Sequence, residues 1–341
     1  MDGWTGWVHR YLEDHKKLLA APSKITPDWD WNDFLAPALQ MGQFAGAQLG
    51  VPYRATVNVL HYQKALLEQV GFAEPPKTFD QLRDAAIACT KAGAPNRYGM
   101  GLFGKEGAAI VGGFQSILLS AGGGAYDPKT WEIFINNEAS VTALQFYGDL
   151  VTKWKVTPPE VTTWGFDEIM AGGQNDRYAM ADMLAPFGSQ INDPRLSKTA
   201  GKWAWTQTPG LTPELAGRAW IGGWTFSVPA TSKNKEWAGE FIKYVTSKPA
   251  MLRSMDSGNL PPRNSVLNDP EILKTYGWAA ATAVALSRAI QNPSDEVWGT
   301  MEARLRTGIS QVLLGQRTAK AALDAVADDW RRSLRRAGLI K

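Results

Sequence analysis

The chain contains very little cysteine and histidine, and this scarcity excludes several kinds of chemistry. Cys89 is the single cysteine, so the chain can form neither an internal disulfide bond nor a cysteine-based metal site. The three histidines, His9, His15 and His61, are too few and too scattered along the sequence for a metal site. Cys89 lies within a helical pattern, and we interpret it as a small buried apolar residue.

A strong excess of one charge and long apolar runs are also absent. The net charge of +3 over 341 residues gives no electrostatic argument for a nucleic-acid partner. No apolar run approaches the roughly 20 residues that are needed to span a bilayer. The first residues carry an acid at position 2 and no apolar core segment, so they do not have the pattern of a secretory signal peptide.

Motifs that would indicate catalysis are missing as well. The sequence has no HExxH and no GxSxG motif, and no pair of carboxylates has a spacing typical of acid–base catalysis. Residues 99–104 match GxGxxG, but a Pro-Asn turn precedes them, whereas a dinucleotide-binding motif follows a buried strand. We interpret these glycines as part of a tightly packed strand. The sequence therefore predicts no enzymatic activity and no cofactor.

A strand that leads directly into a helix is predicted between residues 49 and 72. Val57 and Val59 alternate with small or polar residues, which is typical of an extended segment. From Lys64 onward the apolar residues follow helical spacing. Gly71 ends this helix, because a residue without a Cβ adopts the left-handed conformation easily.

Other local patterns predict further elements. Thr78 and Gln81 form a capping box at the start of a helix over residues 79–91. Residues 29–34 open a helix that extends to about Gly46, with Asp30 or Asn32 as its cap. We also predict helices at residues 112–119, 139–153, 237–247 and 294–314 and a last helix capped by Thr318, with strands at residues 177–183 and 202–207.

The order and spacing of these motifs resemble those of the extracellular solute-binding proteins of ABC transporters, in the carbohydrate-binding family that includes maltose-binding protein. The first match reads Gly50-Val51-Pro52, then Tyr62-Gln63-Lys64-Ala65-Leu66, Gly71 and Pro75-Pro76-Lys77-Thr78-Phe79-Asp80-Gln81-Leu82. Later matches are the segment 219–229, then Ser232-Lys233-Asn234-Lys235-Glu236 with its helix, and the segment 258–265. The resemblance covers about residues 1–335 and is strongest at residues 49–93 and 219–269.

The resemblance implies an α/β fold with two lobes, the periplasmic-binding-protein (type II, Venus-flytrap) fold, in which three chain crossings form a hinge. The expected first lobe comprises residues 1–54 and 227–268, and the second comprises residues 55–226 and 269–341. Because the family places several strands before the Gly-x-Pro strand, we expect the first lobe to be incomplete here. We also expect the reading frame to extend upstream and to encode a secretory signal.

The function that the resemblance implies is capture of a sugar, a sugar alcohol or a small oligosaccharide in the cleft between the lobes. The expected partner is the membrane permease of an ABC transporter, at the periplasmic or extracellular face of the membrane, and we expect a monomer. One alternative is a glycosidase-like carbohydrate-active enzyme, which would need a close pair of carboxylates facing the ligand. Another is a truncated relic that binds nothing.

Aromatic candidates for the ligand site follow from the chemistry of sugars. A sugar or polyol has a weakly apolar CH face that suits an aromatic plane, and the chain contains 15 tryptophans. Trp224 follows Gly222-Gly223 on the second crossing, where small residues allow close approach of the backbone. Trp298 and Phe187 occupy positions where the resemblance implies ligand-stacking aromatics. Phe114 lies early in its helix.

Polar candidates come from the crossings and from the start of the chain. Arg263 follows two prolines at the third crossing, and its guanidinium could hold two hydroxyl groups. Asp2 resembles a residue just after a sheet strand, where the family places ligand contacts. We therefore predict a ligand-binding group without catalytic or metal-binding residues, formed by Trp224, Trp298, Phe187, Phe114, Asp2, Trp4, Arg263 and the first-crossing residues Tyr53, Arg54 and Thr56.

Overall fold

The computed structural model describes residues 11–44, 46–255, 257–291 and 297–341. The helices of these segments are α1 (His15–Leu18), α2 (Ala36–Gln40), α3 (Lys64–Gln69), α4 (Phe79–Gly93), α5 (Ala108–Ser120), α6 (Glu138–Thr152), α7 (Phe166–Gln174), α8 (Phe187–Ile191), α9 (Lys235–Val245), α10 (Lys248–Met255), α11 (Asn264–Leu267), α12 (Pro270–Thr275), α13 (Trp278–Ser287), α14 (Trp298–Leu313) and α15 (Ala319–Arg336). The strands are β1 (Gln43–Phe44), β2 (Ala47–Gln48), β3 (Val51–Thr56), β4 (Asn58–Gln63), β5 (Tyr98–Gly101), β6 (Tyr178–Leu184), β7 (Trp203–Thr206), β8 (Trp220–Phe226) and β9 (Ile290–Gln291).

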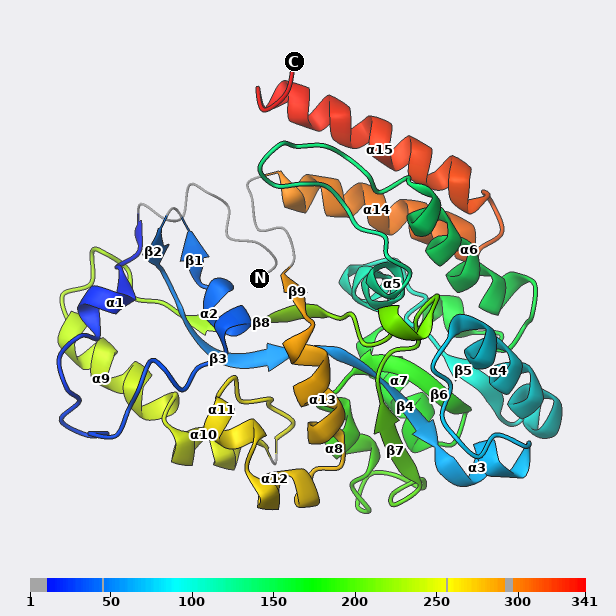
Figure 1. The fold of residues 1–341 in the computed structure, drawn as a ribbon, viewed down its shortest axis with the longest axis horizontal. Helices are drawn as coiled ribbons and strands as arrows, with labels where there is room; N and C mark the ends of the chain where they lie inside the picture. Colours follow the sequence, from blue (N-terminus) through cyan, green and yellow to red (C-terminus); the bar gives the residue numbers. More distant parts are fainter. Residues whose placement is uncertain (1–10, 45, 256, 292–296) are drawn as a thin grey trace.

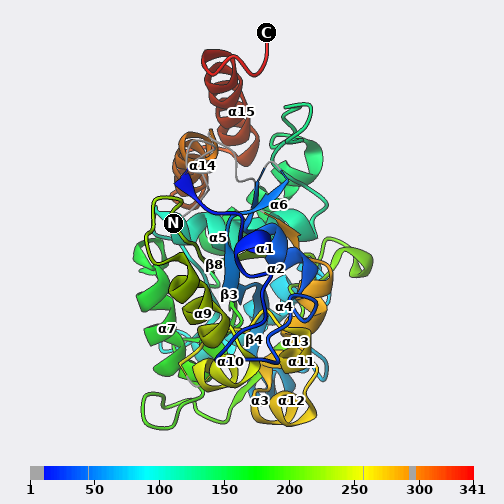
Figure 2. The same cartoon turned by 90° about the vertical axis from the view of Figure 1, so that its left-hand side faces the viewer.

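The elements form two lobes that a small sheet joins, as Figure 1 shows. One lobe contains α1, α9 and α10, and the larger lobe contains α3 to α7 with α14 and α15. In both views α14 and α15 lie at one end of the molecule and α12 lies at the other, with the β3–β8 pair between them (Figure 1, Figure 2). The predicted two-lobed α/β fold is therefore confirmed.

The three predicted crossings lie side by side at the junction of the lobes. Strand β3 pairs with β8 in antiparallel orientation, and β9 extends this sheet on the far side of β8. The backbone N–H of Ala55 in β3 donates to the carbonyl of Leu260 at 2.9 Å, which brings the third crossing against the first. After Val57 the chain continues as β4, so one extended segment passes from the junction sheet into the second lobe.

Among the residues that the structure describes, buried apolar side chains form three cores. The largest lies in the second lobe and includes Leu60, and a small one in the first lobe includes Val51 and Ile242. The third, which we call the junction core, joins Val57 and Val59 to helices α2, α11 and α13. Because this core mixes segments that the sequence assigned to different lobes, the residue boundaries of the lobes stay a prediction.

Strand β4 is buried along its whole length, in the four-stranded sheet β5-β6-β4-β7 of the second lobe. Its alternate side chains enter two different cores, since Val59 faces the junction core and Leu60 faces the core of the second lobe. The polar side chains of the strand are consequently buried too. His61 illustrates the result, because burial lowers the pKa of its imidazole to about 4.

Several local predictions are confirmed by the structure. Helix α3 starts at Lys64, and Gly71 follows it with a φ of 94° in the left-handed region. Cys89 is buried within α4. Thr78 accepts a hydrogen bond from the N–H of Gln81, but the Gln81 side chain accepts from the N–H of Lys77, so the capping box is only half formed.

The helix predicted from residue 29 to Gly46 is wrong. The Asp30 carboxylate accepts from the N–H of Asn32 in a turn, and the helix starts only at Ala36, with Pro37 in its first turn. It ends at Gln40, and the chain continues into the β1–β2 pair. A Cβ on Gly42 would overlap the carbonyl of Gly50. Glycine is therefore needed at position 42, because two backbone segments approach each other closely there.

We expect Gly99→Ala to lower the free energy of unfolding by about 1–3 kcal/mol, because the added methyl group overpacks a tight contact. A Cβ at this position of β5 would overlap the backbone of Ala86 in α4. Gly299→Ala is the matched control, since its Cβ meets no described atom within 4 Å and alanine favours a helix. Urea denaturation measures both variants, and equal midpoints for Gly99→Ala and the wild type would contradict the prediction.

Candidate functional site

The register of β3 against β8 collects three predicted site residues on one face of the junction sheet. Arg54 lies opposite Trp224 and Thr56 lies opposite Gly222, and directly paired residues in a sheet share a face. Two residues further along, the Asn58 amide donates to the carbonyl of Gly112 in α5 at 3.3 Å, so this face is directed toward α5.

The opposite face of the junction sheet packs against protein at Ala55, Ile221 and Gly223. Ala55 and Ile221 belong to the junction core, and a Cβ on Gly223 would lie 2.7 Å from the methyl carbon of Met41. Residues that alternate along the two strands therefore have different environments. We call the face that carries Arg54, Thr56, Trp220 and Trp224 the junction face.

Trp224 presents a large aromatic surface on the junction face, because 45% of it is exposed. The neighbouring Trp220 ring lies over Gly222, where a Cβ would come within 2.6 Å of the ring. Glycine at position 222 therefore makes room for the indole of Trp220, while the indole of Trp224 remains exposed. An exposed tryptophan plane is suited to stacking on an apolar ligand face.

Arg54 and Thr56 add polar groups beside Trp224. Arg54 is half-buried, and its Nε atom is inaccessible to solvent and has no hydrogen-bond partner. Thr56 is buried on the same side of β3. The junction face thus combines an aromatic plane, a guanidinium and a hydroxyl group, which are the groups that a polyhydroxylated ligand requires.

Tyr53 and Phe187 lie apart from this group. Tyr53 occupies the irregularity of β3 between Pro52 and Arg54, and its ring stacks on Phe226 at 4.3 Å. Phe187 opens α8, and its ring makes an edge contact with Phe166 at 6.3 Å. A ligand-binding role for these two rings stays a prediction.

Three of the predicted ligand contacts have side chains that are buried in protein contacts, so their role in binding stays a prediction. Trp298 is 1% exposed and lies between the rings of Tyr126 and Trp330, at 6.2 and 6.0 Å. Phe114 has no exposed surface in the core of the second lobe. Arg263 is 2% exposed and is held by protein groups. Asp2 and Trp4 lie outside the described residues.

Protein groups of the first lobe hold the side chain of Arg263. Its Nε donates to the carbonyl of Thr246 at 2.6 Å, and Nη1 donates to the carboxylate of Asp33 at 3.0 Å. The guanidinium also lies over the Phe34 ring, 4.0 Å from its centroid. Asp33 in turn accepts from the backbone and the hydroxyl of Ser265. This network fixes the third crossing against the segment before α2.

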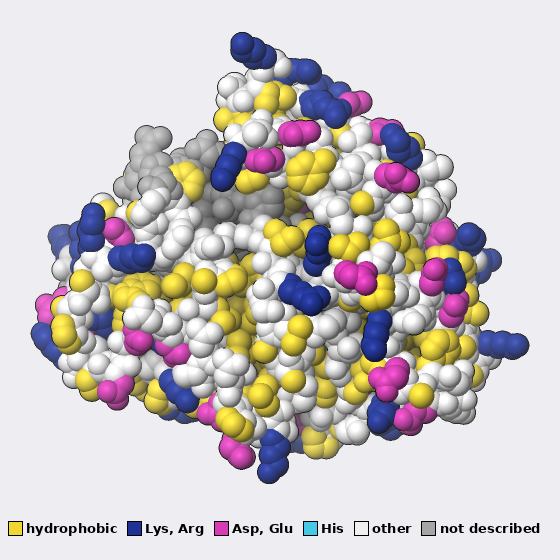
Figure 3. Space-filling view, in the orientation of Figure 1, with side chains coloured by type: hydrophobic (Ala, Val, Ile, Leu, Met, Phe, Trp, Pro, Cys, Tyr) yellow, Lys and Arg dark blue, Asp and Glu magenta, His cyan; other side chains and the backbone are white. Residues whose placement is uncertain are grey.

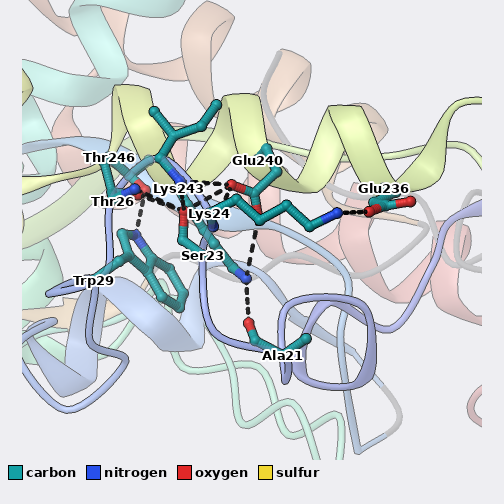
Figure 4. A network of polar contacts seen from close by, with 10 residues as sticks. Ala21, Ser23, Lys24, Thr26, Trp29, Glu236, Glu240, Lys243 and Thr246 are labelled. Carbon is teal, nitrogen blue, oxygen red and sulfur yellow. Dashed lines mark hydrogen bonds and ion pairs between the residues drawn. The ribbon is translucent and has the colours of Figure 1, made fainter.

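A second polar network attaches the loop after α1 to helix α9 (Figure 4). The Glu240 carboxylate accepts from the Ser23 hydroxyl at 2.7 Å and from the backbone N–H of Lys24 at 3.0 Å. The Lys243 ammonium group donates to the carbonyl of Ala21 at 2.5 Å, and the Trp29 indole donates to the Thr246 hydroxyl at 2.9 Å. Every one of these groups is bonded within the protein, so the network stabilises the lobe and offers no free ligand contact.

The sequence analysis missed a buried polar cluster beside the junction face. The Asp182 carboxylate on β6 accepts from the Asn58 amide at 3.0 Å and from the Thr208 hydroxyl at 2.5 Å. Burial raises the pKa of Asp182 to about 6, although these two hydrogen bonds act to lower it. Only the polar residues within otherwise apolar strand patterns could have indicated the cluster, and they do not identify their partners.

One surface cavity, of about 320 Å³, lies away from the junction face beside the β1–β2 pair. Its lining includes Lys16, Gln43 and Gln48. The Gln48 amide is already used, since it donates to the carbonyls of Leu39 and Gly50. The cavity therefore offers few free polar groups.

Figure 3 shows acidic and basic side chains interspersed over one face of the molecule, without a broad region of one sign. In the part of the chain that the structure describes, no three His, Cys, Asp or Glu side chains come together as a metal site. No helix there is both long and apolar enough to cross a bilayer.

Two lobes joined by adjacent crossings, with a free aromatic plane and polar groups at the junction, define a two-lobed ligand-binding protein. The family model of the bacterial extracellular solute-binding proteins matches residues 4–252. The chain belongs to this family.

Related proteins agree in sequence and in structure. The mannitol-binding protein of Pseudomonas aeruginosa is 25% identical over an alignment of 359 positions, which spans 98% of this chain and 80% of that protein. The maltose-bound MalE3 protein of T. maritima has a TM-score of 0.84 at 25% identity, over 95% of this chain and 81% of that one. An ABC transporter solute-binding protein from Agrobacterium vitis with bound D-mannitol has a TM-score of 0.82 at 25% identity, over 98% and 83% of the two chains.

We expect Asp182→Asn to remove a pH dependence of stability. The pKa of Asp182 is raised by burial from 3.8 to about 6, so the folded protein binds a proton more tightly than the unfolded chain. The stability of the wild type relative to the variant should therefore fall as pH rises from about 4 to about 6, by on the order of 3 kcal/mol, and stay constant above that. Urea titrations across this pH range measure the difference.

Asp193→Asn is the control for this experiment, because Asp193 is a surface carboxylate whose pKa is lowered to about 2 by its hydrogen bonds from Arg195. This variant should keep the slope of the wild type between pH 4 and 6. If Asp182→Asn also keeps that slope, the carboxylate of Asp182 does not titrate in this range.

We expect Arg263→Met to lower the free energy of unfolding by about 3 kcal/mol or more, because Asp33 is left without its cationic partner. Arg253→Met is the control, since Arg253 is exposed on α10 and should change stability by less than about 0.5 kcal/mol. Denaturation and ligand titration are measured on the same samples. If Arg263→Met has normal stability but has lost affinity for the ligand, Arg263 contacts the ligand and the prediction is wrong.

Proposed function

We propose that this solute-binding protein captures a sugar, a sugar alcohol or a small oligosaccharide between its lobes and presents it to the permease of an ABC transporter. The observation that carries the proposal is the junction face, where the exposed plane of Trp224 lies beside Arg54 and Thr56. Related proteins whose names or bound ligands are known take mannitol and maltose, which are both polyhydroxylated.

The proposed binding uses the two kinds of surface that such a ligand has. Its CH face stacks on the indole of Trp224, and its hydroxyl groups hydrogen-bond to side chains of the junction face. Movement of the lobes about β3, β8 and the third crossing would close the cleft and exclude water from these contacts. The junction-face residues include no carboxylate pair, and the proposal contains no step in which a bond is made or broken.

The proposal places the protein at the periplasmic or extracellular face of the membrane, where members of this family act. A permease recognises the closed form, because only closure fixes the relative position of the two lobes.

Binding of the ligand to the folded protein should raise its thermal stability, by an amount that grows with ligand concentration. A thermal-shift screen of sugars and sugar alcohols, with D-mannitol and maltose included, identifies the ligand. If no member of the panel raises the melting temperature, the proposed function is wrong.

We expect Trp224→Ala to weaken binding of the identified ligand about tenfold or more, because the stacking surface is removed, and to change stability little. Trp237→Ala is the matched control: Trp237 is 67% exposed on α9, and its loss should leave the affinity unchanged. Isothermal titration calorimetry gives both affinities. A large loss of stability with an unchanged affinity would show that Trp224 serves the fold instead of the ligand.

A further inference from the structure

Arg54 differs from the other arginines that have a buried nitrogen without a hydrogen-bond partner. The described residues in this class are Arg54, Arg97 and Arg263. Arg97 is paired with Asp176 at 2.9 Å, and Arg263 is paired with Asp33 at 3.0 Å. For Arg54, the described parts of the chain provide no carboxylate partner.

An uncompensated cation in a half-buried position is unfavourable, because the protein replaces water around the guanidinium without supplying an opposite charge. Asp182 on β6 does not supply one either, because it already accepts from Asn58 and Thr208 and forms no ion pair with Arg54. The missing partner of Arg54 must therefore come from outside these groups.

The position of Arg54 indicates where that partner would lie. Arg54 is the register partner of Trp224, whose exposed ring shares the junction face with it. A ligand that stacks on Trp224 thus has one end within reach of the guanidinium. Arginine presents parallel N–H groups that match the two oxygens of a carboxylate.

We propose that the ligand carries a carboxylate which binds the guanidinium of Arg54, so that the preferred ligand is a sugar acid such as an aldonate or a uronate. This inference rests on the proposed function and specifies its ligand class. A phosphate group offers similar oxygen atoms but carries up to two negative charges. The junction face has one cationic side chain, Arg54, among its four residues, which favours the singly charged carboxylate.

The test compares matched ligands that differ in the acidic group. Isothermal titration calorimetry is carried out with D-mannitol and D-mannonate, with D-glucose and D-glucuronate, and with D-glucose 6-phosphate. For the wild type we expect the carboxylate of at least one pair to bind about tenfold or more tightly than its neutral partner. We expect the phosphate to bind more weakly than the carboxylate.

Two substitutions at position 54 test the residue itself. Arg54→Gln should weaken binding of the acid much more than binding of its neutral partner, so that the preference for the acid is lost. Arg54→Lys retains the charge but not the paired N–H groups, and its preference should be intermediate. Arg253→Gln is the control, since it removes one positive charge from the exposed surface of α10 and should bind as the wild type does.

The outcomes separate this inference from the proposed function. If the neutral ligands bind more tightly than the acids and Arg54→Gln does not change this order, the inference is wrong and the proposed function stands. Preference for the phosphate overturns the assignment of a carboxylate. If none of these ligands binds and the thermal-shift screen finds a neutral sugar instead, only the inference is wrong; if that screen also finds no ligand, the proposed function fails together with the inference.

Discussion

The antiparallel pairing of β3 with β8 is the constraint on which the rest of this structure depends. It determines which side chains of both strands face α5 and which enter the junction core, because a shift of one residue would exchange the two faces. Strand β3 continues into β4 and the segment after β8 leads to α9. The same pair of strands therefore both joins the lobes and positions Arg54 opposite Trp224.

Polar networks within the protein lie on both sides of the junction. In the first lobe, Arg263 and Asp33 bind each other and the backbone around them. In the second lobe, Asp182 is held between Asn58 and Thr208. Between these networks, the Nε atom of Arg54 has no hydrogen-bond partner, and the ring of Trp224 is exposed. An exposed aromatic ring next to a guanidinium that has no carboxylate partner is what indicates a ligand site here.

Local patterns predicted much of the fold because their physical causes are local. Gly71 ends α3 through its own backbone freedom, and Thr318 caps α15 through the N–H of Ala321 three residues away. The failed helix after residue 29 has a different cause. Its apolar residues suited a helix, but Pro37 delayed the start and the contact of Gly42 with Gly50 favoured a turn into a β-pair. That contact depends on the packing of the backbone and is not encoded in the periodicity.

The sequence by itself determined the family, the two-lobed fold, the order of the crossings and the presence of aromatic and polar residues along them. The tertiary structure decided which of those residues are free to bind. Trp224 and Trp298 are the same residue type at equally suggestive positions, but Trp298 is enclosed by Tyr126 and Trp330, which lie far from it in the sequence. Arg54 and Arg263 likewise differ only in whether the fold brings a carboxylate to them. Burial and charge compensation are set by neighbours that come together on folding, so no local pattern could distinguish the members of either pair.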